Sequence, residues 1–173
     1  MPPPPRIAPR ATKLPLDLRP GDHVVFIGNT LFDLAQWDGV FESFLHSRFP
    51  DHRLVVRTLA WSADEIDLQP RPDHFGLLHQ HLAVQKADVI FAAFGFNESF
   101  AGEAGLPEFR QRLVRFLAEL RSSAFNGATG PRIVLLSPIA NEEVPGVPAA
   151  QMNNERLAAY TQAMAEAAAA EEV

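Results

Sequence analysis

The sequence alternates between short runs rich in valine and isoleucine and longer segments with helical periodicity. The apolar runs are residues 23–28, 53–59, 87–95 and 132–137. Nearly unbroken apolar runs are typical of strands that helices cover on both faces. Strands joined by helical segments usually pair in parallel. The pattern therefore predicts an α/β fold built on a parallel sheet.

Two of the intervening segments carry apolar stripes at helical spacing, which we expect to lie in the core. The stripes consist of Trp37, Phe41, Phe44 and Leu45, and of Phe109, Leu113, Phe116 and Leu120. Pro72 and Asp73 are expected to open the second helix, and Pro107 to stand in the first turn of the third.

A last helix is expected from Asn153 to the final residue, with Leu157, Tyr160 and Met164 on its buried face. Its end is unusual, because Glu171 and Glu172 place carboxylates where the helix dipole is already negative.

Composition narrows the class of protein. A chain of 173 residues suits one domain with a continuous core. No apolar run reaches the roughly 18 residues that a membrane span requires. The formal charge of −6, with scattered basic residues, argues against a nucleic-acid partner. The absence of cysteine excludes disulfides and thiolate metal ligands.

The first 20 residues are rich in proline and are predicted to form an extended tail before a domain at residues 21–173. They lack the apolar segment of a secretory signal, so a cytoplasmic location is expected if the chain starts here.

Ligands of open α/β sheets gather at the carboxyl ends of the strands. The four segments that follow the strands read "GNTLFD", "TLAWSADEI", "FGFNESFAG" and "LLSPIANEE". None contains a Walker pattern or the glycines of a dinucleotide turn, so no nucleotide cofactor is expected.

Together these segments resemble the sequence blocks of the SGNH hydrolases, the GDSL esterase and lipase family. "GNT" (residues 28–30) aligns with the Gly-Asp-Ser of the first block, "LAWSAD" (59–64) with the second, and "GFNE" (95–98) with the Gly-x-Asn-Asp block. The resemblance implies a three-layer α/β/α sandwich with strand order 2-1-3-4 and acyl transfer from an ester to water.

The resemblance also implies roles for individual residues. Thr30 occupies the nucleophile position, the Ala63 backbone N–H and the Asn97 side chain occupy the oxyanion donor positions, and no metal or cofactor is expected. Substrate-binding positions are Asn29, Trp61, Ser62 and Glu98. The implied partner is a small ester or an acylated carbohydrate.

The sequence departs from the family at three places. Thr30 adds a methyl group to the nucleophile, Asn29 replaces a carboxylate, and Ala63 replaces a glycine, which demands that Ala63 avoid a positive φ. The late Asp-x-x-His block and its fifth strand are missing from these residues. The six histidines lie at positions 23, 46, 52, 74, 79 and 81, none of them expected to reach Thr30.

A hydroxyl nucleophile needs a base. We therefore expect a weak or inactive ester hydrolase domain, truncated before its catalytic block, or a noncatalytic ligand-binding or interaction domain of the same fold.

Structural explanations remain open for the same residues. Thr30 suits a helix N-cap, and Asn97 suits a loop amide that binds backbone groups. "HFGLLHQH" (74–81) lacks the one-face spacing of a metal site. We expect Glu98, Glu103, Glu142 and Glu143 to be solvated. An unpaired outer edge on strand 132–137 predicts self-association.

Overall fold

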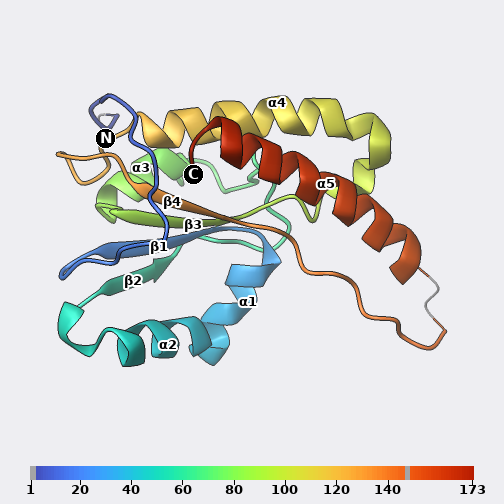
Figure 1. Cartoon of the computed structure of the whole chain (residues 1–173), viewed down its shortest axis with the longest axis horizontal. Helices are drawn as coiled ribbons and strands as arrows, with labels where there is room; N and C mark the ends of the chain where they lie inside the picture. The colour runs from blue at the N-terminus through green and yellow to red at the C-terminus, as the bar shows by residue number, and fades with distance from the viewer. Residues whose placement is uncertain (1–2, 147–148) are drawn as a thin grey trace.

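The computed structural model describes residues 3–146 and 149–173 and shows a four-stranded parallel sheet (Figure 1). Its strands, in the order β2-β1-β3-β4, are β1 (His23–Gly28), β2 (Val55–Thr58), β3 (Val89–Ala93) and β4 (Arg132–Leu136). Each neighbouring pair is parallel, with Val24 opposite both Val56 and Val89. The predicted parallel sheet and strand order are confirmed.

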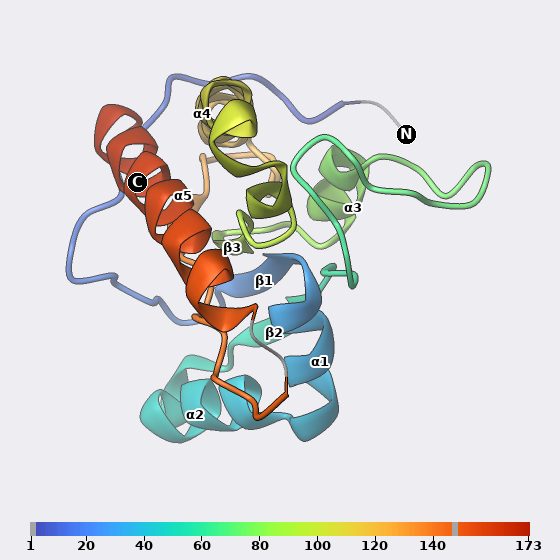
Figure 2. The same cartoon turned by 90° about the vertical axis from the view of Figure 1, so that its right-hand side faces the viewer.

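Helices cover both faces of this sheet. Figure 2 shows α1 and α2 on one side and α3, α4 and α5 on the other, so the predicted three-layer sandwich is confirmed. The helices are α1 (Thr30–Asp38), α2 (Val40–Arg48), α3 (Leu78–Val84), α4 (Gly102–Arg121) and α5 (Ala150–Ala170), with short 3₁₀ turns η1 (Pro50–His52) and η2 (Glu98–Ala101). None of the described helices is long and apolar enough to cross a membrane.

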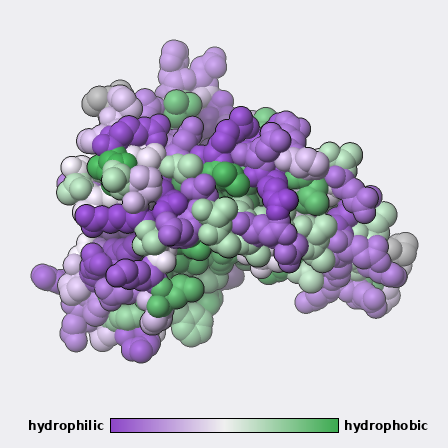
Figure 3. Space-filling model, turned by 45° about the horizontal axis from the view of Figure 1, so that its top comes forward, coloured by the Kyte–Doolittle hydropathy of each residue, from purple (hydrophilic) through white to green (hydrophobic). Residues whose placement is uncertain are grey.

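Two hydrophobic cores lie on opposite faces of the sheet. Val25 and Ile27 of β1 belong to the core under α4 and α5, whereas Val24 and Phe26 belong to the core under α1. Side chains alternate between the faces of a strand, so the continuous apolar run of β1 supplies both cores. The outward face of α4 and α5 is mostly hydrophilic (Figure 3).

The expected core stripe of the third segment is confirmed on α4, where Phe109, Leu113, Phe116 and Leu120 are buried. The expected stripe of the first segment is correct for Leu45, which packs against the core under α1, but wrong for Trp37 and Phe44. Trp37 is 80% exposed and Phe44 is 69% exposed. The physical reason is Gly39, whose left-handed φ of 61° ends α1 and starts α2 in a new direction.

Three helix boundaries differ from expectation. Pro72 and Asp73 lie in the loop before α3, which begins at Leu78. Pro107 lies inside α4, because the chain is already helical from Gly102. The last helix, α5, begins at Ala150 instead of Asn153 and ends at Ala170, so the expectation that it runs to the final residue is wrong, but it buries Leu157, Tyr160 and Met164 as predicted.

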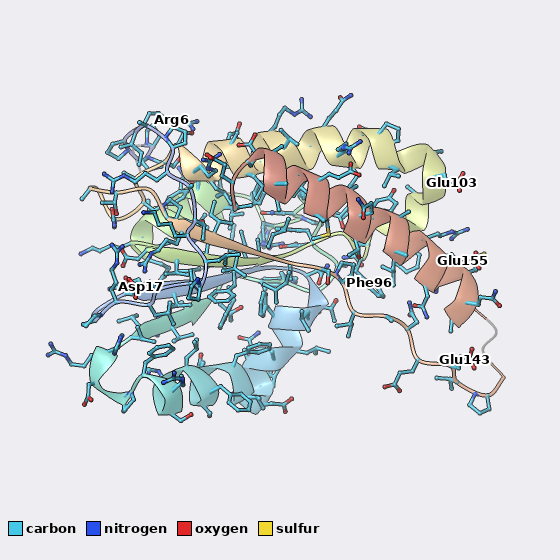
Figure 4. All side chains as sticks on the ribbon, in the orientation of Figure 1. Arg6, Asp17, Phe96, Glu103, Glu143 and Glu155 are labelled. Atoms are coloured by element: carbon cyan, nitrogen blue, oxygen red, sulfur yellow. The ribbon has the colours of Figure 1, made fainter. Side chains whose placement is uncertain are left out.

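The N-terminal segment packs on the domain, and we call residues 3–20 the N-terminal strap. Ile7 N–H donates to Ser122 at the end of α4 (2.9 Å), and Thr12 N–H donates to Glu172 after α5 (2.9 Å). Figure 4 shows Arg6 beside the C-terminal end of α4, where its guanidinium donates to Ser122 Oγ (2.7 Å). Leu18 is buried in the hydrophobic core that lies under α1.

Candidate functional site

Hydrogen bonds join the loops that follow β1, β2 and β3 at one end of the sheet. Trp61 N–H, in the β2 loop, donates to the carbonyl of Gly28 (3.0 Å). Asn29 N–H, in the β1 loop, donates to the carbonyl of Ala93 at the end of β3 (3.1 Å). The segments that carry the three SGNH-like blocks therefore converge, because neighbouring parallel strands end at the same edge.

Gly28 is required for the first of these turns. Its φ is 123°, and a Cβ atom at this position would lie 2.0 Å from the Ala93 carbonyl oxygen. Only glycine permits this close approach between the ends of β1 and β3.

The turn after Gly28 is capped by Asn29, not by Thr30. The buried Asn29 is the N-cap of α1, and its Oδ1 accepts from Leu31 N–H at 3.4 Å. Thr30 is the first residue of the helix and is exposed. The N-cap explanation of Thr30 is therefore wrong, and its hydroxyl stands at the positive end of the α1 dipole.

Ala63 adopts a left-handed conformation with φ of 66°, so the expectation that it avoids positive φ is wrong. The cause is the tight turn in which Asp64 N–H donates to the Trp61 carbonyl at 3.1 Å. Ala63 is exposed, and no acceptor meets its N–H in the part of the chain that the structure describes. This backbone donor is thus available to a ligand.

Asn97 links the β3 loop to the turn that holds Ala63. Its Nδ2 donates to the carbonyl of Asp64 at 3.1 Å. A side-chain amide carries two N–H groups, so this bond leaves one donor for a ligand. The loop-amide role and the oxyanion role of Asn97 are therefore compatible.

Glu98 is buried, so the expectation of a solvated carboxylate is wrong. Its two oxygens accept from Ile66 N–H (3.1 Å) and Gly95 N–H (2.8 Å), which ties the β2 and β3 loops together. Burial raises the pKa of Glu98 above its ordinary value of 4.5, against the opposing effect of these backbone hydrogen bonds. Glu103, Glu142 and Glu143 are exposed as expected.

The pair Asp64–Arg71 was not expected from the sequence. The buried Asp64 carboxylate accepts a hydrogen bond from each terminal nitrogen of the Arg71 guanidinium, at 2.8 and 2.5 Å. The Arg71 guanidinium also lies 4.8 Å from the Trp61 ring centroid and 5.8 Å from that of Phe75. Nothing in the seven-residue separation marks this pair, because the loop between the partners has no regular period.

A second carboxylate fixes the β2 loop to α1. Asp33 Oδ2 accepts from Ser62 N–H at 2.8 Å and from Ser62 Oγ at 2.5 Å. Asp33 is one helical turn beyond Thr30, so this contact sets the position of Ser62 and Trp61 relative to α1.

A groove of about 900 Å³ runs between α1, the β2–α3 loop and α3, and we call it the α1–α3 groove. Trp61 lines it, whereas Thr30, Ala63 and Asn97 do not. Asn97 and Glu98 line a separate cavity of about 220 Å³ beside Tyr160. Figure 2 shows the β2–α3 loop projecting away from the sheet next to α3.

The described histidines make contacts away from Thr30. His23 Nδ1 lies 2.6 Å from the Gln85 carbonyl, and His81 Nε2 lies 2.9 Å from the Phe75 carbonyl. Burial lowers the pKa of His79, opposed by the nearby Glu119 carboxylate. No hydrogen bond joins a histidine to Thr30, and no group of three metal-ligating residues occurs, within the described ranges 3–146 and 149–173.

A parallel α/β/α sandwich with a hydroxyl after β1 and amide donors after β2 and β3 is typical of SGNH-type ester hydrolases. Residues 21–173 match the sequence profile of the GDSL-like Lipase/Acylhydrolase family, and the chain belongs to this family. A comparison with curated protein sequences found no match.

Solved structures share the fold at low sequence identity. An acetyl xylan esterase superimposes with a TM-score of 0.64 at 13% identity, over 86% of this chain and 73% of that one. A family two carbohydrate esterase from Cellvibrio japonicus superimposes with a TM-score of 0.59 at 14% sequence identity. The match covers 92% of this chain and 52% of that one. A gut microbial diltiazem-metabolizing enzyme superimposes with a TM-score of 0.61 at 16% sequence identity. The match covers 90% of this chain but only 36% of the length of that enzyme.

Proposed function

We propose that this chain binds a small ester or acylated carbohydrate and acts as a weak ester hydrolase domain. The observation that carries the proposal is the hydrogen bond from Asn97 to the Asp64 carbonyl, which ties the side-chain donor to the turn that presents Ala63 N–H. A tetrahedral intermediate requires donors of this kind that are fixed before the reaction.

The proposed chemistry is acyl transfer. Thr30 Oγ1 forms a bond to the ester carbonyl carbon, its proton goes to a base from solution such as imidazole, and the negative charge that develops on the carbonyl oxygen is held by Ala63 N–H and Asn97 Nδ2. Collapse of the intermediate breaks the bond to the alcohol oxygen, which leaves with a proton. Water then releases the acyl group by the same steps.

The base is the weak part of this site. A threonine hydroxyl is a poor nucleophile at neutral pH without a proton acceptor. Catalytic groups of this type act as a unit, and loss of a member leaves about 10³ to 10⁴ over water from the oxyanion donors and binding. We therefore expect negligible turnover of p-nitrophenyl acetate by the 173-residue chain.

Imidazole can test this proposal by acting as a diffusible base. Turnover above a protein-free imidazole blank should rise with imidazole concentration, and Thr30→Ala or Asn97→Ala should abolish the rise. Strong activity without imidazole that disappears in Thr30→Ala would overturn the proposal that the chain lacks a base. An imidazole effect that is equal in both variants and the parent would overturn the assignment of the site.

The second candidate function is a noncatalytic ligand-binding domain. It is favoured by the contacts that engage His23, His79 and His81 elsewhere in the structure. Saturable binding of an ester without any imidazole-dependent turnover would select this alternative.

We also propose that the outer edge of β4 mediates self-association, because a sheet edge with unpaired backbone groups is a template for another chain. The formal charge of −6 makes nucleic acid an unfavourable partner.

A further inference from the structure

Both tryptophans of the chain line the α1–α3 groove. Trp37 lies on α1 and is 80% exposed, and Trp61 lies in the β2 loop and is 52% exposed. Large aromatic side chains usually contribute to a core or an interface, so two exposed rings on one groove indicate a binding surface.

The Trp61 side of the groove is built in advance of any ligand. The ring meets Phe75 edge-on, with centroids 6.4 Å apart and planes at 84°. Arg71 stacks over both rings and is itself held by the buried Asp64 carboxylate. This arrangement fixes the ring orientation, so little side-chain freedom remains to be lost on binding.

Polar side chains also line the groove. Asp33 accepts from Ser62 and Gln36, and the remaining acceptor capacity of Asp33 and Gln36, together with the amide of Gln69, is open to sugar hydroxyl groups. Asp67 and Glu119 also line the groove, beside Arg112 (3.4 Å) and His79 (3.7 Å) respectively, and the positive charge of Arg71 is paired with Asp64, so the lining offers an anion no unpaired arginine or lysine among the described residues. The groove therefore disfavours anionic ligands such as fatty acids or phosphates.

We propose that the α1–α3 groove binds a neutral oligosaccharide. The C–H faces of sugar rings stack on the electron-rich faces of aromatic rings, and their hydroxyl groups bind carboxylates and amides. A volume of about 900 Å³ lies within the range of roughly 300–1,000 Å³ for small-molecule sites. The inference rests on the proposed function in one respect, since the sugar is placed as the alcohol part of the ester.

An aliphatic acyl chain does not fit the same observations. A site for such a chain is expected to be enclosed and apolar, because its affinity comes from burial of hydrocarbon. Leu59, Leu78 and Phe116 line this groove, but they share it with acidic and amide side chains, and its two tryptophan rings are 80% and 52% exposed, so hydrocarbon bound there would stay partly in water.

Intrinsic fluorescence reports on this groove directly, because both tryptophans of the chain line it. Titration of the full chain with a neutral xylo-oligosaccharide or cello-oligosaccharide should give a saturable change in emission, and octanoate should give none. Trp61→Ala and Trp37→Ala should each weaken sugar affinity by at least about tenfold, the size of an interface hot-spot loss. Trp61→Phe should retain part of the affinity and controls for loop folding.

A matched variant completes the test. Phe44→Ala removes another exposed aromatic ring, 69% exposed but outside the groove, and should leave sugar binding unchanged. Sugar binding by a parent chain that shows no imidazole-dependent turnover would refute the hydrolase function but not the groove. Absence of saturable sugar binding by fluorescence and calorimetry, a sugar affinity in both tryptophan-to-alanine variants equal to that of the parent chain, or tighter binding of octanoate than of sugar would overturn the proposal.

Discussion

Ala63 carries a side chain where the backbone favours glycine. A left-handed conformation costs a non-glycine residue about 1–2 kcal/mol, because Cβ approaches the following carbonyl oxygen. The turn persists because Asp64 is anchored on both sides, through its carboxylate to Arg71 and through its carbonyl to Asn97. The strain therefore lies beside the proposed oxyanion donor, where strained backbone is common in functional sites.

Ala63→Gly should stabilise the protein by about 0.5–1 kcal/mol. Relief of the left-handed strain exceeds the added freedom of glycine in the unfolded chain, which costs about 0.4–1 kcal/mol. Urea unfolding followed by circular dichroism measures the change in the free energy of unfolding. Ala128→Gly, at an exposed loop position without positive φ, is the control and should destabilise slightly. A loss of stability in Ala63→Gly would contradict the assigned backbone conformation.

At the scale of elements, the acidic end of α5 is stabilised by another helix. Glu171 and Glu172 accept from the two terminal nitrogens of Arg121, at 3.2 and 3.0 Å. Arg121 is the last residue of α4, and its side chain is only 8% exposed. The guanidinium therefore offsets both the carboxylates and the negative end of the α5 dipole.

Arg121→Met should destabilise the protein by about 2 kcal/mol. Loss of one partner from a buried ion pair costs roughly 3–5 kcal/mol, and the 65% exposure of Glu172 reduces that cost here. Urea midpoints at constant pH provide the measurement. Arg112→Met is the matched control, because its ion pair with Glu108 is exposed at the surface and contributes less than about 1 kcal/mol. Equal effects in the two variants would show that the Arg121 pair has no special role.

At the scale of the whole molecule, the strap lies against the open edge of the sheet. In β4, Arg132 N–H faces β3 and donates to the Asp88 carbonyl just before that strand (2.9 Å). The next N–H, that of Ile133, faces the open edge and donates to Thr12 Oγ1 in the strap (3.0 Å). Alternate residues of a strand face the same edge, so Leu135 presents its backbone groups outward as well. The strap thus engages one part of the edge and leaves another part for self-association.

Removal of residues 1–12 should strengthen self-association. The full chain is expected to form dimers or larger species as its concentration rises, and the shortened chain should do so at lower concentration because Ile133 N–H is then unpaired. Sedimentation velocity over a concentration series measures both. Thr12→Val, which keeps the chain length but removes the side-chain acceptor, should lie between them. Monomeric behaviour of all three proteins at high concentration would refute the proposal.

The sequence by itself determined the α/β class, the parallel sheet and the positions of the blocks after β1, β2 and β3, whereas the strand order was expected from the family resemblance. These features depend on local information: apolar runs such as 23–28, helical spacing on α4, and short segments at strand ends. Period and composition are properties of neighbouring residues, so they can be read without knowing the distant contacts of the chain.

Only the tertiary structure decided which side chains of this fold are buried, exposed or paired. The burial of Glu98, the pair Asp64–Arg71 and the exposure of Trp37 depend on which loops meet in space. The strap followed no periodic pattern, and its contacts with Ser122 and Ile133 join residues more than a hundred positions apart. Such contacts are fixed by packing, because the same short segment can be solvated or buried depending on what the fold places against it.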